Sequence, residues 1–163
     1  MGKEVEVLIE VCREDVELPQ YAHFGDAGMD IRAAEDIDIH PGETVAVPTG
    51  LKVVIPVGYE IQVRPRSGIS LKTPLRLPNS PGTIDSGYRD EVHVIIYNSS
   101  KGGEEIYSIS EKGNKEGIYR IKKGERIAQI VLKEVPVIKW KKVEDVSLEG
   151  NNRGGGFGSS GTK

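Results

Sequence analysis

The chain has 163 residues, which suits one domain with a single core, and its 37% hydrophobic and 29% charged residues are ordinary for a globular protein. The formal net charge of −3 argues against a general binder of nucleic acid or anionic membrane. Cys12 is the single cysteine, which excludes an intramolecular disulfide and a cysteine-rich zinc site. No apolar run approaches the roughly 18 residues of a membrane span, and the N-terminus is patterned as a strand instead of a secretion signal. We therefore expect a cytoplasmic protein.

Short strand patterns separated by turn residues run through the first part of the chain. Twenty glycines and nine prolines are too many for a helical bundle and favour an all-β sandwich or barrel. Residues 3–12 alternate charged and apolar side chains, which predicts a strand with one buried face. Residues 37–39 predict a second strand before the Pro41-Gly42 turn. Three further apolar segments between residues 45 and 63 have the short, regular spacing of a β-sandwich.

Two acids lie in a glycine-containing turn before residue 37. Gly25, Asp26, Gly28 and Asp30 form this turn. Its carboxylates can orient a hydrated metal, since Mg²⁺ keeps most of its waters and takes only one or two carboxylates. The alternative is that they simply hydrogen-bond the turn, and the residues alone leave both open.

An arginine and a helix start follow the residue 59–63 strand pattern. Ser67 is a suitable N-cap, and residues 69–72 predict one helical turn that Pro74 stops by disfavouring a helical Thr73. A helix N-terminus beside Arg66 can bind an anion. The alternative is a surface turn with a solvated arginine.

The stretch 79–91, NSPGTIDSGYRDE, predicts a tight hairpin that runs into a strand at residues 92–97. It carries one carboxylate, Asp85, and one ring, Tyr88. The backbone of such a hairpin can bind the edge of a small planar ligand beside the carboxylate. An ordinary hairpin with both side chains solvated remains the alternative.

The second half of the chain contains a polar excursion and the last predicted strands. Residues 99–117 are glycine-rich and predict a protruding hairpin around residues 106–109, with no evident chemistry. Residues 118–133 predict two strands around a Lys123-Gly124 turn. Residues 135–140 predict the last core strand, with Trp140 as a packing residue.

The tail, residues 149–163, is too rich in glycine to pack a core. Its GxGxxG spacing is not a dinucleotide site, because that fingerprint needs a strand before it and a helix after it. Two interpretations remain: a disordered RGG-like tail that binds nucleic acid, or a flexible arm that closes over a phosphate ligand with glycine N–H groups, hydroxyls and Arg153. Phe157 is an isolated ring that could stack on a base.

Five segments resemble, in order, the five motifs of the trimeric dUTPase family (deoxyuridine triphosphate nucleotidohydrolases). They are DAGMDIRA (26–33), PRSGIS (65–70), NSPGTIDSGYRDE (79–91), GERIAQ (124–129) and RGGGFGSSG (153–161). Gly87 and Asp90 depart from the third motif, where the family has an acid and a glycine. The excursion at 99–117 is also atypical.

The resemblance implies a fold, an assembly and an activity. The expected fold is an all-β, jelly-roll-like barrel of short strands with at most one short helix, assembled as a homotrimer whose active sites are shared between subunits. Residues 1–148 form the barrel and residues 149–163 a flexible arm that closes over the site. The implied reaction is Mg²⁺-dependent hydrolysis of dUTP to dUMP and pyrophosphate, which keeps uracil out of DNA and supplies dUMP for thymidylate synthesis. We expect no nucleic-acid or membrane partner.

The resemblance also implies roles for individual residues. Asp85 deprotonates the attacking water, Gln129 lies near that water, and Asp30 lies near the waters of a metal that has no direct protein ligand. Uracil, sugar and phosphates are contacted by two groups of residues. From the barrel these are Asn79, Thr83, Ile84, Asp85, Tyr88 and His93 around the nucleoside and Arg66, Ser67 and Gly68 at the phosphates; from the arm they are Arg153, Phe157, Gly158, Ser159 and Ser160.

Two other functions share features with this sequence. A dCTP deaminase shares the fold and much of the third motif, but it needs a glutamate as a proton shuttle on the strand after the hairpin. Ile95 occupies that position here and cannot carry a proton. The other rival is a catalytically silent nucleotide-binding barrel or scaffold, against which Asp85, Arg153 and Phe157 speak.

Overall fold

The computed structural model describes residues 2–111 and 113–163. Short strands and a single α-helix account for its regular structure in these residues, together with one 3₁₀ turn. In chain order they are β1 Leu8–Val11, β2 Met29–Arg32, β3 Ile37–Ile39, β4 Thr44–Pro48, β5 Leu51–Val54, β6 Tyr59–Arg64, α1 Ser67–Lys72, β7 Leu75–Arg76, β8 Gly82–Ile84, β9 His93–Asn98, β10 Ile106–Ser108, β11 Ile118–Ile121, β12 Arg126–Glu134 and η1 Val146–Leu148.

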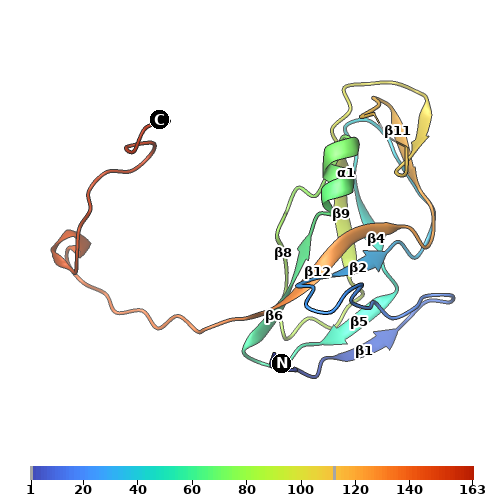
Figure 1. The fold of residues 1–163 in the computed structure, drawn as a ribbon. Helices are drawn as coiled ribbons and strands as arrows, with labels where there is room; N and C mark the ends of the chain where they lie inside the picture. The colour runs from blue at the N-terminus through green and yellow to red at the C-terminus, as the bar shows by residue number, and fades with distance from the viewer. Residues whose placement is uncertain (1, 112) are drawn as a thin grey trace.

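The strands form four small sheets that wrap around a common interior (Figure 1). Their orders are β2-β12-β6-β8, β4-β9-β7, β10-β11-β3 and β1-β5. All pairs are antiparallel except β10 with β11. The prediction of an all-β fold of short strands with one short helix is confirmed. In the described residues, no helix is long and apolar enough to cross a lipid bilayer.

The hydrophobic core lies between these sheets and is built mainly from aliphatic side chains. Burying a Val, Leu or Ile completely contributes about 1.5–3 kcal/mol relative to leaving it exposed. The core is therefore the main source of stability for the strand framework that carries the site. Its least exposed hydrophobic members, all at 1% or below, are Ile31, Ile39, Val47, Leu75, Val94, Tyr119, Ile121, Ile127 and Ala128.

The stretch 79–91 does not pair with residues 92–97 as a hairpin, so that prediction is wrong. β8 pairs with β6, with Ile84 opposite Ile61, whereas β9 pairs with β4 and β7. The chain thus crosses from one sheet to another between residues 85 and 92. The physical reason is that Ile84 and Val92 are both buried, at 8% and 6% exposure, in different surroundings. Ile84 pairs with Ile61 on β6, whereas the Val92 backbone bonds to Thr49 and Leu51.

The excursion at 99–117 does not form a protruding hairpin either. β10 pairs in parallel with β11, and the rings of Tyr107 and Tyr119 lie 5.9 Å apart. The base of the excursion is held by Asn98, which is fully buried and donates to the carbonyls of Ile39 and Gly117 at 2.9 and 2.8 Å. The excursion therefore extends the β11-β3 sheet and is tied to the body.

The C-terminal part leaves the body where β12 ends at Glu134 (Figure 1). The predicted strand at 135–140 is absent from this described segment. Trp140 is 85% exposed, and Val137 and Ile138 are 89% and 68% exposed. Trp140 is therefore no packing residue within one chain.

The first strand also differs from its prediction. β1 forms within residues 3–12 and pairs with β5, but it has no buried face. Leu8, Ile9 and Val11 are 57%, 39% and 41% exposed. The expected buried side is present only before β1, where Val5 and Val7 are half-buried and Val7 packs against the core, whereas the apolar residues of β1 itself stay exposed.

Candidate active site

Three strands bring part of the predicted site together. Gln129 on β12 lies opposite Asp30 on β2 and opposite Arg64 on β6. Arg66 follows β6, and its Nε donates a hydrogen bond to Asp30 Oδ1 at 3.0 Å. Arg126, at the start of β12, has its Nε 3.8 Å from Asp30 Oδ2. The candidate residues of the first, second and fourth motif-like segments therefore form one cluster of a carboxylate, an amide and arginines.

Gln129 is held from two sides. Its Nε2 donates to the carbonyl of Pro65 at 3.0 Å. A Cβ atom on Gly28 would lie 2.8 Å from Gln129 Oε1 and 3.2 Å from the carbonyl oxygen of Ile130. Real Cβ atoms essentially never come within 3.0 Å of such a neighbour. Gly28 is thus the residue that lets the Gln129 side chain lie against the turn.

The short helix α1 begins one residue earlier than the cap prediction requires. Arg66 is the N-cap, with extended φ/ψ of −86° and 135°, and no side chain caps the helix. Ser67 is therefore the first helical residue, and its prediction as N-cap is wrong, because the extended backbone of β6 continues through Arg66. The predicted stop is confirmed: Thr73, before Pro74, is extended at φ −137° and ψ 161°.

The start of α1 is open to a ligand. Ser67 and Gly68 are exposed, and a Cβ at Gly68 would meet no atom within 4 Å. Arg66 projects to the Asp30 side of this segment. Binding of phosphate oxygens by these three residues stays a prediction.

A second group of site residues follows β8. Thr83 and Asp85 are exposed on either side of the buried Ile84. β8 is the edge strand of its sheet, so the side of its backbone that faces away from β6 has no strand partner. A Cβ at Gly82 would lie 3.3 Å from Val63 Cβ and 3.4 Å from Asn79 Nδ2. The glycine thus allows β8 to lie close to β6 with Asn79 beside it.

Tyr88 and His93 meet at one carbonyl. The Tyr88 hydroxyl donates to the backbone oxygen of Glu91 at 2.8 Å, and His93 Nδ1 lies 3.0 Å from the same oxygen. The Glu91 carboxylate accepts two hydrogen bonds from Arg13, at 2.7 and 3.0 Å, and one from the backbone N–H of Gly50 at 2.8 Å. The Arg13 guanidinium, helped by the Gly50 N–H, lowers the pKa of Glu91.

The two groups lie on opposite sides of β6 and toward opposite ends of it. Gln129 is opposite Arg64, while Ile84 is opposite Ile61. The step from Arg64 to Ile61 is about 10 Å at about 3.3 Å per residue, and Asp85 lies one residue beyond. One chain therefore does not bring Asp85 together with Gln129 and the other predicted catalytic residue, Asp30.

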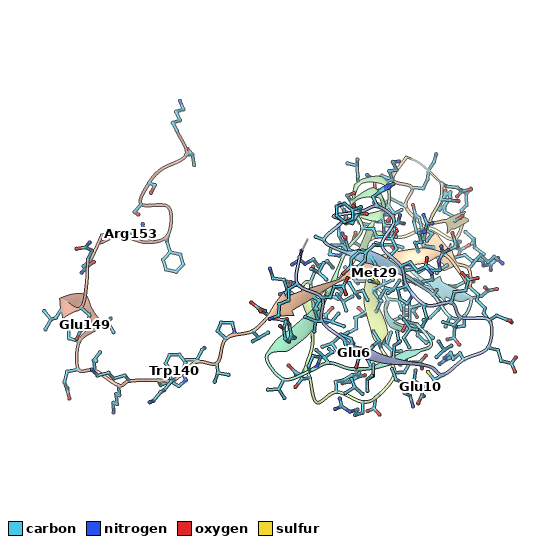
Figure 2. All side chains as sticks on the ribbon, turned by 60° about the horizontal axis from the view of Figure 1, so that its bottom comes forward. Glu6, Glu10, Met29, Trp140, Glu149 and Arg153 are labelled. Atoms are coloured by element: carbon cyan, nitrogen blue, oxygen red, sulfur yellow. The ribbon has the colours of Figure 1, made fainter. Side chains whose placement is uncertain are left out.

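The arm residues lie away from both groups. Figure 2 shows Trp140, Glu149 and Arg153 far from Met29 on β2. Phe157 is fully exposed. The arm has only local order, with hydrogen bonds from Ser159 N to Gly156 O at 2.8 Å and from Gly161 N to Gly158 O at 2.9 Å. Within one chain, none of the predicted arm residues, Ser160 included, is brought to the barrel.

Several residues near the site were missed by sequence reasoning. Arg126 could have been found, because it is a charged residue that interrupts a buried strand pattern. Arg13 and the segment 15–22 gave no signal. That segment lines a cavity of about 550 Å³ together with Asp30 and Arg126. Asp30 lines this cavity and Asp85 does not, so the cavity does not point to Asp85.

The side chains near the site decide what kind of metal ion could bind there. Across the described ranges, 2–111 and 113–163, no group of three or more His, Cys, Asp and Glu side chains is placed to hold one. Asp30 is the carboxylate within the arginine cluster, and one of its oxygens already accepts from Arg66. Such a site fits an ion that takes its ligands mainly from substrate phosphates and water.

Fold and site together define the class of protein. Guanidinium groups and backbone N–H groups in glycine-rich segments both bind phosphate oxygens. An all-β chain with an arginine cluster, an exposed loop carrying Asp85 and Tyr88, and a glycine-rich arm therefore fits an enzyme that acts on a phosphate-bearing ligand. The comparisons with known proteins make the class specific.

The family model described as dUTPase matches residues 14–161. The deoxyuridine 5'-triphosphate nucleotidohydrolase of Clostridium tetani is 41% identical over 154 residues, 94% of each chain, and that of Hydrogenobaculum sp. is 45% identical over 161 residues, 98% of this chain and 100% of the relative. The chain belongs to the dUTPase family, whose enzymes are dUTP diphosphatases.

Solved structures agree with the fold. The dUTPase of Staphylococcus bacteriophage 80alpha with bound dUpNHpp superposes with a TM-score of 0.83 at 33% identity, over 96% of this chain and 99% of that one. A mutant dUTPase from phage phi11 of S. aureus, described with a structural Mg(II) ion, has a TM-score of 0.78 at 28% identity, over 88% and 99%. These neighbours are consistent with the predicted jelly-roll-like fold.

Proposed function

We propose that the protein hydrolyses dUTP to dUMP and pyrophosphate in active sites assembled from three copies of the chain. The observation that carries the assembly is the separation of the site. Asp85 and the Asp30, Arg66 and Gln129 cluster lie on opposite sides of β6, and the arm lies off the body. Family membership supports the activity, and the separation supports a shared site.

Exposed apolar segments support the homotrimer. β1 leaves Leu8 and Val11 at the surface, and the segment after β12 leaves Val137, Ile138 and Trp140 there. Apolar surface is stabilised by removal from water, at about 25 cal/mol per Å². Contact with neighbouring copies would remove this apolar surface from water without any change of fold. Light scattering or analytical ultracentrifugation tests this, and a monomer at working concentration would contradict it.

In the proposed reaction Asp85 takes a proton from a water molecule as its oxygen attacks the α-phosphorus in line. The new bond joins the water oxygen to the α-phosphorus, and the bond to the oxygen that bridges the α- and β-phosphorus breaks. Pyrophosphate leaves with that oxygen, and dUMP remains. Gln129, fixed by Pro65, orients the attacking water from a neighbouring copy.

The phosphates meet side chains and backbone from two places. Arg66, Ser67 and Gly68 hold phosphate oxygens at the open start of α1. From the arm, Arg153 and an exposed set of N–H and hydroxyl groups hold the terminal phosphates and exclude water as the arm orders. That set comprises Gly158, Ser159 and Ser160. Mg²⁺, when bound, would offset phosphate charge, with Asp30 holding it through water.

The nucleoside is recognised at the loop after β8. Asn79 and the accessible backbone of residues 83–85 pair with uracil, whose donor and acceptor pattern is the reverse of that of cytosine. His93 lies beside the base, and Phe157 stacks on it. Tyr88 packs under the sugar, where its ring leaves no space for a 2'-hydroxyl.

Pyrophosphate release with Mg²⁺ tests the proposal, with dUTP, dCTP, dTTP and UTP offered separately and the nucleotide products identified. Release from dUTP alone, giving dUMP, is expected. Ammonia or dUMP formed from dCTP would instead indicate a deaminase. Such a result would contradict the argument from Ile95, which lies half-buried on β9 opposite Ala46 and cannot carry a proton. No turnover of any of the four by a folded oligomer would indicate a silent binding protein.

A further inference from the structure

Glu91 joins the exposed loop after β8 to Val92, the buried residue that precedes β9. Its side chain is 15% exposed, and its carboxylate accepts from Arg13 Nε at 2.7 Å, from Arg13 Nη2 at 3.0 Å and from the Gly50 N–H at 2.8 Å. The two bonds from Arg13 are bidentate, a geometry that fixes direction as well as contributing energy. Arg13 is held in turn by Glu35, with Nη1 3.2 Å from Oε2. The carboxylate of Glu91 therefore has one position.

The backbone of the next residue, Val92, is also fixed. The N–H of Val92 donates to the carbonyl of Leu51 at 2.8 Å, and the carbonyl of Val92 accepts from the N–H and hydroxyl of Thr49 at 3.1 and 2.6 Å. The Glu91 carbonyl belongs to the peptide group whose N–H is that of Val92, so the Val92 bonds and the Glu91 carboxylate bonds restrain it from both sides along the chain. It is this carbonyl that accepts the hydrogen bond from the Tyr88 hydroxyl.

Tyr88 depends on that bond because little else holds its ring. The residue is 38% exposed, and a Cβ on the preceding Gly87 would meet nothing within 4 Å. Its own backbone makes only local bonds, from Tyr88 N to Asp85 O at 3.1 Å and from Arg89 Nη1 to Tyr88 O at 3.1 Å. The position of the ring is therefore set at two points, Asp85 at the base and the Glu91 carbonyl at the hydroxyl.

We propose that Arg13 and Glu91 are positioning residues that set the place of the Tyr88 ring and, through it, the selection of deoxyribonucleoside over ribonucleoside triphosphates. The inference rests on the proposed dUTP hydrolysis and on Tyr88 packing under the sugar. Neither residue touches the substrate, since both act through the carbonyl of Glu91. Arg13 lies one residue before the stretch 14–161 that matches the family model.

Steric selection is sensitive to such positioning. A misplacement of about 1 Å can cost about 10²-fold in rate, and discrimination by shape alone is worth about 10–200-fold for a group of methylene size. Loss of the Arg13 anchor lets the loop relax. A ring that moves away from the sugar loses contact with dUTP and gives space to the hydroxyl of UTP.

The experiment measures kcat/KM for dUTP and for UTP with the full-length enzyme. Arg13→Ala is expected to lower the ratio of the two about tenfold. Tyr88→Phe, which keeps the ring and removes the bond to the Glu91 carbonyl, is expected to do the same. Because both act on one bond, the double variant should be no worse than the more affected single variant. Effects that multiply would overturn the proposal.

Arg120→Ala is the matched control. Arg120 makes an equally bidentate pair with Asp38, at 2.7 and 2.9 Å, on the β11-β3 sheet. Its loss should leave the dUTP-to-UTP ratio unchanged, and a ratio lowered as much as by Arg13→Ala would overturn the proposal, because the effect would then be one of general stability. Circular dichroism accompanies each variant, and Arg13→Gln replaces Arg13→Ala where the alanine variant does not fold.

Failure of this inference is distinguishable from failure of the proposed function. Wild-type protein that does not hydrolyse dUTP would overturn both. Wild-type protein that selects dUTP, with Arg13→Ala of unchanged selectivity, would overturn the positioning role alone.

Discussion

Asp30 and Arg66 form an ion pair across 36 residues of sequence, with Arg66 Nε 3.0 Å from Asp30 Oδ1. The pair joins β2 to the open start of α1. Each side chain is about one-third exposed, at 33% and 32%, so the pair has little effect on stability. Its consequence is geometric, because it fixes the Arg66 guanidinium beside the segment that we propose to bind phosphate.

Asp30→Asn tests this relationship. The amide keeps the size of the side chain and loses its charge, so Arg66 is no longer directed, and kcat/KM for dUTP should fall about tenfold. Asp38→Asn removes the carboxylate of a similar pair with Arg120, remote from the site. It should leave kcat/KM near the wild-type value. Equal activity of Asp30→Asn and wild type would remove Asp30 from the site.

Asp85→Asn tests the proposed base. Asparagine cannot accept the proton of the attacking water, and a general base contributes about 10²–10⁴-fold to rate. We expect kcat to fall within that range while a non-hydrolysable dUTP analogue binds with similar affinity, measured by calorimetry. The exposed position of Asp85 makes a folding defect an inadequate explanation for the loss. Turnover at the original rate would contradict the assignment.

The sequence predicted the strands more reliably than their partners. Apolar alternation identifies a strand and its apolar side, but it does not say what covers that side. This is why residues 3–12 were expected to have a buried face, and why Trp140 was expected to pack within the chain. The wrong prediction of a hairpin at 79–91 has the same origin. Ile84 is buried by pairing with β6, which is distant in the sequence, and local turn residues do not encode such a pairing.

The sequence predicted which residues and which segments form the site, but it did not predict how they are arranged in space. Asp30, Arg66 and Gln129 came together because their strands are neighbours in one sheet. Asp85 did not join them because the register of β8 on β6 places it further along the sheet. Arg13 had no local signal, since its partner Glu91 lies 78 residues away.

Gly28→Ala should lower activity by displacing Gln129. The added Cβ would lie 2.8 Å from Gln129 Oε1, and the carbonyl of Ile130 at 3.2 Å leaves little room on the other side. The expected result is a loss of stability of about 1–3 kcal/mol and a fall in kcat for dUTP. Thermal unfolding and steady-state kinetics measure the two effects. Gly102→Ala is the control, because a Cβ there would meet nothing within 4 Å.

Stability should fall in acid because of carboxylates held by arginines. Arg13 lowers the pKa of Glu91, so the folded state binds the proton less tightly than the unfolded state. The contribution of Glu91 is therefore fully present above its unfolded pKa, about 4.3, and is lost as pH falls through the lower folded pKa. Glu91→Gln should flatten the loss of stability below about pH 4.3, measured by denaturant unfolding between pH 3 and 6.

Arg120 lowers the pKa of Asp38 in the same way, so Asp38→Asn should also flatten the acid limb. The sign follows from the same linkage, since the charged form is favoured in the folded state. Acid unfolding as steep in both variants as in wild type would show that these pairs are not formed in solution.

Truncation before Arg153 separates folding from catalysis. The removed residues are exposed and hold only local turn bonds, so they contribute little to the free energy of unfolding. The truncated protein should keep its thermal midpoint and its trimeric mass. Its kcat/KM for dUTP should fall at least tenfold, because Phe157 and the arm's phosphate-binding groups no longer close over the substrate and water enters.

A shorter change identifies which part of the arm acts. Phe157→Ala removes the ring and leaves the chain length and the glycines intact, so a loss of activity close to that of the truncation would assign the effect to stacking on the base. Arg153→Ala with the ring in place would show the phosphate contribution in the same way. Dissociation of the trimer on truncation would contradict the division of roles, because it would mean that residues 153–163 hold the subunits together.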